Sequence, residues 1–111
     1  MENLAGRRCK PCEGGVQRFD ASQARAWLGQ VPGWALGEDA ASITKTYRFN
    51  DFYETMAFVN ALAWIAHRED HHPVLTVSYR ECAVRYTTHA IAGLSENDFI
   101  CAAKLDNVIG A

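Results

Sequence analysis

The sequence lacks the features that mark several classes of protein. It has 111 residues, only four cysteines and three prolines, and no apolar run near the roughly 18 residues that a membrane-spanning helix needs. Four cysteines in a chain of this length are too few for a disulfide scaffold. The first residues also lack the apolar stretch of a signal peptide, so we expect a reducing, cytoplasmic location and no membrane partner.

The chain also has no surplus of positive charge. Eleven lysines and arginines stand against 13 acidic residues, which gives a formal net charge of -2. This balance gives the chain no excess positive charge to attract phosphate groups, and it argues against nucleic acid as a direct partner. An apolar content of 49% excludes a disordered chain. The length allows one domain, so we predict an N-terminal arm over residues 1–19 and a single folded domain over 20–111.

Turn signals and apolar spacing predict three helices and two pairs of strands. One helix follows the N-cap Asp20 over about 21–30, a long one covers 51–68, and a last one runs from Ser95 to about residue 109. The strands are expected at about 34–36, 42–49, 74–79 and 82–88. The order α-β-β-α-β-β-α indicates an α+β fold, with the helices packed on one face of an antiparallel sheet.

The long helix has an unusually wide apolar face. One stripe at helical spacing consists of Phe52, Met56, Val59, Ala63 and Ala66. A second stripe beside it consists of Phe58, Leu62 and Ile65. Together they cover about half the circumference, which is more than one sheet face needs. We therefore predict that the second stripe is buried against another copy of the chain in a homo-oligomer.

Three of the four histidines lie within 19 residues: His71, His72 and His89. The proline after His72 disfavours helix there, so the two adjacent imidazoles should diverge just beyond the end of the helix. A two-residue turn at Arg80-Glu81 places His72 opposite His89, and a longer turn would still leave both at one end of the sheet. Roles as surface or helix-end residues are the alternative, but converging titratable groups are typical of a functional site.

Two groups of residues contain metal-binding side chains: the three histidines and the pair Cys9 and Cys12. Three imidazoles can bind zinc, but adjacent histidines rarely face one ion and no HxH or HxxxH spacing occurs. Cys9 and Cys12 form a lone CxxC, without the second pair of a zinc ribbon. A mobile arm is the stronger interpretation of this segment, and a zinc or redox role is the weaker one. We therefore predict no metal.

Three further residues each allow two interpretations. Asp98 fits the spacing of a capping box that begins at Ser95, and it also continues the inward stripe of the last helix. If Asp98 faces inward, its carboxylate would fix the tautomer of an imidazole and favour the protonated ring. Asp70 is either a solvated helix-end acid or a ligand contact. Trp34 is either a core residue or a flat platform for a ligand.

These motifs resemble those of the pterin-4a-carbinolamine dehydratase family, in particular its bacterial members. The matching motifs are Glu69-Asp70-His71-His72-Pro73, Thr88-His89, Gly93-Leu94-Ser95 with Asp98, Pro32-Gly33-Trp34, Arg48-Phe49-Asn50-Asp51-Phe52, and the Cys-Lys-Pro-Cys-Glu-Gly leader. The resemblance covers nearly the whole chain. It implies a four-stranded antiparallel sheet with three helices, assembled as a dimer or tetramer.

The resemblance also implies an activity. The family dehydrates the 4a-hydroxy-tetrahydropterin (4a-hydroxytetrahydrobiopterin) left by aromatic amino-acid hydroxylases, and it needs no metal or cofactor. The implied catalytic residues are His71, His72 and His89, with Asp98 in support. The implied pterin contacts are Asp70, His71, His72, Thr87, Thr88, His89 and Ala90, to which we add Trp34. The chain departs from common family residues at His67, Leu75 and Ala90.

The chemistry agrees with this set of residues. Loss of water from a carbinolamine needs a proton on the leaving hydroxyl and a base for the proton on N5. Imidazoles titrate near neutral pH, so one histidine can act as the acid and another as the base, in an order that the sequence leaves open. Two alternatives remain: an enzyme of another pterin or molybdopterin pathway, and a non-catalytic dimerisation or regulatory protein.

Overall fold

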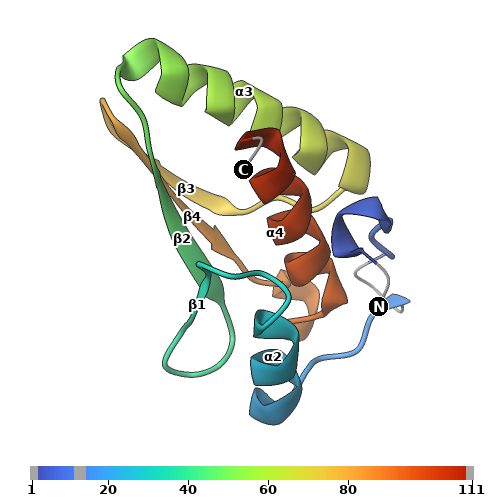
Figure 1. Ribbon diagram of the computed structural model, residues 1–111. Coiled ribbons are helices and arrows are strands. Elements are labelled where there is room, and N and C mark those ends of the chain that lie inside the picture. Colours follow the sequence, from blue (N-terminus) through green and yellow to red (C-terminus); the bar gives the residue numbers. More distant parts are fainter. Residues whose placement is uncertain (1–2, 12–14, 110–111) are drawn as a thin grey trace.

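The computed structural model describes residues 3–11 and 15–109 and has an α+β fold. Its elements are η1 (Leu4–Gly6), α2 (Ala21–Leu28), β1 (Ala35–Leu36), β2 (Ile43–Arg48), α3 (Phe52–Glu69), β3 (Val74–Val77), β4 (Glu81–Tyr86), η2 (His89–Ile91) and α4 (Glu96–Ile109). The four antiparallel strands form one sheet in the order β1-β2-β4-β3. The helices α2, α3 and α4 lie on one side of this sheet (Figure 1). The predicted fold class and element order are confirmed.

Local polar contacts define where α2 and α3 begin. The Asp20 side chain accepts a hydrogen bond from the Gln23 backbone at 2.8 Å, and the Gln23 side chain accepts one from the Asp20 backbone at 3.0 Å. This capping box satisfies two backbone donors at the start of α2 and confirms the predicted N-cap. Asp51 caps α3 with a single hydrogen bond, which its side chain accepts from the Glu54 backbone at 2.8 Å.

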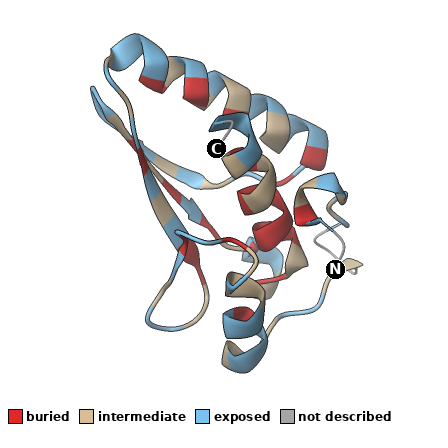
Figure 2. Ribbon diagram, in the orientation of Figure 1, coloured by how far each residue is buried: buried red, intermediate tan, exposed pale blue. Residues whose placement is uncertain are grey.

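The core lies between the sheet and α4. Its strand residues include Ile43 and Tyr47 of β2 and Val84 of β4, and its helix residues include Phe99 and Leu105 of α4. Figure 2 shows that many buried residues lie along α4 and that others lie in the strands. Burial of these side chains removes apolar surface from water, at about 25 cal/mol per Å², and holds α4 against the sheet. This position of α4 matters because its first turn carries Asp98.

The rotation of α3 differs from the prediction. Phe58 and Leu62, assigned to a stripe that needs a partner chain, are 4% and 2% exposed within one chain. Trp64, by contrast, is 61% exposed. The buried Thr55 lies on the same line as Phe58, and its hydroxyl donates to the Tyr79 carbonyl at 2.9 Å. This contact and the core packing turn the second stripe inward, so the prediction that it is surplus is wrong.

The β3–β4 hairpin is shifted by two residues from the predicted register. Val77 pairs with Cys82, and the backbone N–H of Ser78 donates to the Glu81 carbonyl at 2.9 Å. The turn is therefore Tyr79-Arg80, one residue earlier than predicted. Because a shift of two preserves the alternation of faces, Val84 still points into the core.

The described part of the predicted N-terminal arm lies against α3 and α4. Leu4 is part of the core, and Lys104 of α4 donates to the Ala5 carbonyl at 2.8 Å. The backbone of Cys9 donates to the Glu69 side chain at 2.8 Å. Cys12, the second cysteine of the CxxC, lies outside the described residues. Within the described ranges, no helix has the length and hydropathy to cross a membrane.

Candidate active site

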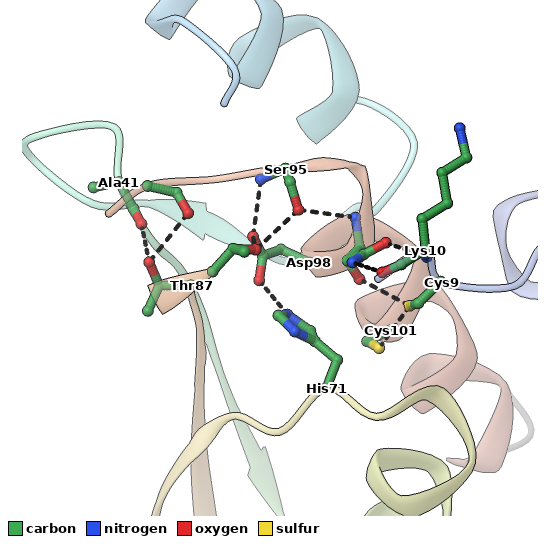
Figure 3. A network of polar contacts seen from close by, with 11 residues as sticks. Cys9, Lys10, Ala41, His71, Thr87, Ser95, Asp98 and Cys101 are labelled. Carbon is green, nitrogen blue, oxygen red and sulfur yellow. Dashed lines mark hydrogen bonds and ion pairs between the residues drawn. The ribbon is translucent and has the colours of Figure 1, made fainter. Parts of the chain in front are cut away.

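A buried pair, His71 and Asp98, forms the centre of the candidate site. Their Nε2 and Oδ1 atoms lie 2.7 Å apart, and the two side chains are 5% and 0% exposed (Figure 3). Asp70, just past the end of α3, adopts the left-handed conformation with φ 53°. This turn directs the next residue, His71, inward. The Tyr86 ring stacks on the imidazole, with a centroid distance of 5.8 Å and an interplanar angle of 9°.

The Asp98 carboxylate also holds the start of α4. Its Oδ2 accepts hydrogen bonds from the Thr88 hydroxyl at 2.8 Å and from the Ser95 backbone at 3.0 Å. The Ser95 hydroxyl accepts in turn from the Asn97 backbone at 3.3 Å. A buried carboxylate needs such donors because an unpaired charge in the interior is costly. The geometry therefore combines both interpretations of Asp98: it caps the helix and it contacts a histidine.

His72 and His89 form a second, exposed pair. Their ring centroids lie 6.2 Å apart at an interplanar angle of 33°. His72 is in the segment between α3 and β3, and His89 begins η2 after β4. The two rings lie close together although the hairpin register behind the prediction was wrong. They meet because both segments leave the sheet at the same end. His71 and His72 diverge as predicted, with the first buried and the second exposed.

The loop after β4 carries the other predicted contacts. Thr87 donates through its hydroxyl to the Ala41 carbonyl at 2.6 Å, which ties the loop to the segment before β2 (Figure 3). Thr88 is buried beside Asp98, whereas Ala90 is exposed on η2. Ala92, at the end of η2, is left-handed with φ 51°. Left-handed non-glycine residues such as Asp70 and Ala92 cost conformational energy and are found preferentially at functional sites.

The structure places Trp34 in the core. The side chain is 5% exposed, and its indole N–H donates to Asp106 at 3.1 Å. Its ring packs against Tyr86 at a centroid distance of 5.8 Å, and against Tyr47 at 6.3 Å. A side chain with so little exposed surface offers no platform to a flat ligand. This placement favours the core interpretation of Trp34 over the predicted substrate contact.

Tyr86 is the site neighbour that the sequence analysis missed. The alternation of β4 placed it on the inward face, but no local signal showed that its ring would lie on His71. Among the described residues its hydroxyl is the only buried side-chain N or O atom without a hydrogen-bond partner. Burial is the main cause that raises the pKa of Tyr86 well above its ordinary value of 10, so the phenol is neutral.

The described residues offer no cluster of metal ligands. In residues 3–11 and 15–109 no three His, Cys, Asp or Glu side chains are grouped so that they could hold a metal ion. Asp98 has both carboxylate oxygens in contact with protein groups, and one of them contacts His71. The arrangement is suited to proton transfer and hydrogen bonding.

Comparison with known sequences identifies one family. A family model described as pterin 4 alpha carbinolamine dehydratase matches residues 17–108. A protein of Dechloromonas aromatica named "Putative pterin-4-alpha-carbinolamine dehydratase" is 57% identical over 107 residues, which cover 96% of this chain and 94% of that protein. A protein of Nitrosomonas eutropha with the same name is 55% identical over 108 residues, with the same two coverages.

Solved structures share the fold. A Brucella melitensis protein described as a transcriptional coactivator/pterin dehydratase matches with a TM-score of 0.79 and 28% identity, over 83% of this chain and 98% of that one. A pterin dehydratase-like protein, described as a RuBisCO assembly factor in the alpha-carboxysome, matches with a TM-score of 0.63 and 21% identity. That match covers 71% of this chain and 92% of the other, and it supports the fold alone.

Proposed function

The chain belongs to the pterin-4a-carbinolamine dehydratase family, and on that premise we propose that it converts 4a-hydroxy-tetrahydropterin to quinonoid dihydropterin and water. The observation that carries the proposal is the grouping of histidines at one end of the sheet. His71 contacts the buried Asp98, and the rings of His72 and His89 lie 6.2 Å apart on the surface. We further propose that the reaction recycles the pterin cofactor of aromatic amino-acid hydroxylases.

The reaction defines what the exposed pair must do. The bond from C4a to the hydroxyl oxygen breaks, N5 loses its proton, and a double bond forms between C4a and N5. An acid must protonate the leaving oxygen while a base accepts the N5 proton. Because these groups sit on adjacent substrate atoms, two neighbouring exposed imidazoles are suited to reach both. We assign the proton donor and the proton acceptor to His72 and His89.

The buried pair supplies a third, oriented imidazole. Asp98 holds His71 by one ring nitrogen, which selects the tautomer, and its charge would stabilise an imidazolium formed during turnover. Stacking by Tyr86 restricts rotation of the same ring. We propose that His71 takes part in the proton transfers and that Asp98 acts through it as a positioning residue. Asp70 and the Thr87–Ala90 loop are proposed to contact the pterin.

A dehydratase assay on 4a-hydroxy-tetrahydropterin tests this proposal. We expect His71→Ala, His72→Ala and His89→Ala each to reduce the enzyme-dependent rate by roughly 10²-fold or more, as shared acid–base catalysis requires. The matched control is His67→Ala, because this fourth histidine is exposed on α3 and packs against Trp64. It should retain the wild-type rate. Near-normal turnover in all three site variants would contradict the acid–base assignment.

An interaction role is the second candidate. The Brucella melitensis relative carries both functions in its description, and α3 of this chain exposes three large aromatic side chains, Phe52, Tyr53 and Trp64. A purely interacting protein would show no dehydratase activity and would tolerate loss of the histidines. An enzyme of a molybdopterin pathway would turn over the biopterin-type substrate only weakly. The same assay therefore separates the three possibilities.

A further inference from the structure

Two cysteine thiols from opposite ends of the chain meet beside α4. The Sγ atoms of Cys9 and Cys101 are 3.5 Å apart, although 92 residues separate them in sequence. We propose that Cys9 and Cys101 form a thiol–disulfide exchange site, which small-molecule disulfides of the glutathione type convert to an intramolecular disulfide. This site is independent of the proposed dehydratase activity.

Hydrogen bonds hold Cys9 in position for this reaction. Its backbone N–H donates to Glu69 at 2.8 Å, and its thiol donates to the Asn97 carbonyl at 3.7 Å. The next residue, Lys10, is anchored on both sides of its backbone by the Asn97 side chain, at 3.0 and 2.8 Å (Figure 3). These contacts place the segment across α4, with the Cys9 sulfur beside that of Cys101.

Only a small movement is needed to bring the sulfur atoms of Cys9 and Cys101 to bonding distance. A disulfide has an S–S distance of about 2.05 Å, so the two sulfur atoms must approach by about 1.5 Å. Cys101 lies within the rigid helix α4, whereas Cys9 lies in a segment after η1 with no helix or strand assigned. The N-terminal segment can therefore make the adjustment while α4 keeps its position in the core.

The two thiols differ in access, and this difference orders the steps. Cys9 is half-buried, whereas Cys101 is fully buried. The hydrogen bond with Cys9, followed by burial, raises the pKa of Cys101. We therefore assign the first attack to Cys9 and the resolving attack to Cys101.

The exchange is balanced in atoms and electrons. The Cys9 thiolate attacks one sulfur of the small-molecule disulfide, forms a mixed disulfide and releases one thiol. The Cys101 sulfur then attacks the Cys9 sulfur, and the departing thiolate takes up the Cys101 proton and leaves as the second thiol. Two protein thiols are oxidised to one disulfide, and one small-molecule disulfide is reduced to two thiols.

The experiment treats the full reduced chain with glutathione disulfide, alkylates the remaining thiols under denaturing conditions and maps the linked peptides by mass spectrometry. We expect a Cys9–Cys101 linkage, also in the Cys12→Ser and Cys82→Ser variants. Cys101→Ala should stop at a glutathione adduct on Cys9. A Cys9–Cys12 linkage, a persistent glutathione adduct in the wild type, or no oxidation would each overturn the proposal.

A second measurement does not depend on any variant. The disulfide would close a loop of more than 90 residues and so restrict the unfolded chain, which raises the thermal midpoint by about 5 °C or more. Dithiothreitol should restore the original midpoint. Oxidised protein with an unchanged midpoint would contradict a linkage between the N-terminal segment and α4.

Discussion

At the scale of single residues, one carboxylate joins the fold to the candidate chemistry. Asp98 contacts His71 through one oxygen and accepts from Thr88 and the Ser95 backbone through the other. Because the side chain is fully buried, loss of any of these contacts leaves a polar group without its partner. The same residue should therefore affect both stability and turnover, and the two effects can be separated by substitution.

Asp98→Asn should lower kcat by about tenfold or more, because the amide keeps the size of the side chain but loses the charge that supports His71. Its cost in folding free energy should be about 1–3 kcal/mol. The control is Ser95→Ala, which removes a helix cap worth about 1 kcal/mol but leaves the His71 contact. Urea unfolding and the dehydratase assay measure the two effects. Equal kcat in Asp98→Asn and the wild type would contradict the positioning role.

Tyr86 offers a second test at this scale. Its ring lies on His71, but its hydroxyl has no partner among the described residues. Tyr86→Phe should therefore keep the dehydratase rate and leave stability unchanged or raise it by about 1 kcal/mol. Tyr86→Leu removes the ring, so it should cost about 2–4 kcal/mol and reduce turnover. A rate loss in Tyr86→Phe as large as in Tyr86→Leu would show that the hydroxyl, and not the ring, matters.

At the scale of elements, Glu69 connects the end of α3 to the N-terminal segment and α4. Its side chain accepts from the Cys9 backbone and pairs with Arg8 at 3.1 Å and with Lys104 at 3.9 Å. Burial alone would raise the pKa of Glu69, but the Cys9 hydrogen bond and the charges of Lys104 and Arg8 outweigh burial and hold the pKa below its usual 4.5. The charged form is therefore favoured by folding.

This shift predicts how stability depends on pH. A carboxyl whose pKa is lowered by folding contributes stability above its unfolded pKa and loses it as the pH falls through the folded pKa. The wild type should therefore lose more unfolding free energy between pH 6 and pH 3.5 than Glu69→Gln does. Urea unfolding at both pH values measures this, with the exposed Glu38→Gln as the control. Parallel losses in wild type and Glu69→Gln would contradict the assignment.

At the scale of the whole molecule, apolar side chains of β3 and α3 remain uncovered in a single chain. The strand β3 is at one edge of the sheet and exposes Val74 and Val77, which are 47% and 40% accessible. The helix α3 exposes Tyr53 and Trp64. An exposed apolar edge strand is favourably covered by pairing with another chain. The case for an oligomer thus rests on these residues instead of Phe58 and Leu62.

We predict a homo-oligomer of at least two chains in solution. Light scattering at micromolar concentration should give a mass of a dimer or tetramer, and Val77→Lys should lower it because a charge at the edge opposes strand pairing. Circular dichroism checks that the variant is folded. A wild-type mass near the single-chain value of 12.3 kDa would contradict the prediction.

The amino-acid sequence by itself determined the three α-helices, the four strands, the Asp20 cap, the fold class and the meeting of His72 with His89. These depend on local interactions, because caps and helical spacing act within about four residues and both histidines flank one hairpin. Tertiary packing alone decided the rotation of α3, the contact of His71 with Asp98 and Tyr86, and the approach of Cys9 to Cys101. Each of these features depends on contacts between segments that are distant in sequence. Local spacing permits several arrangements, and only packing against the sheet and α4 selects one of them.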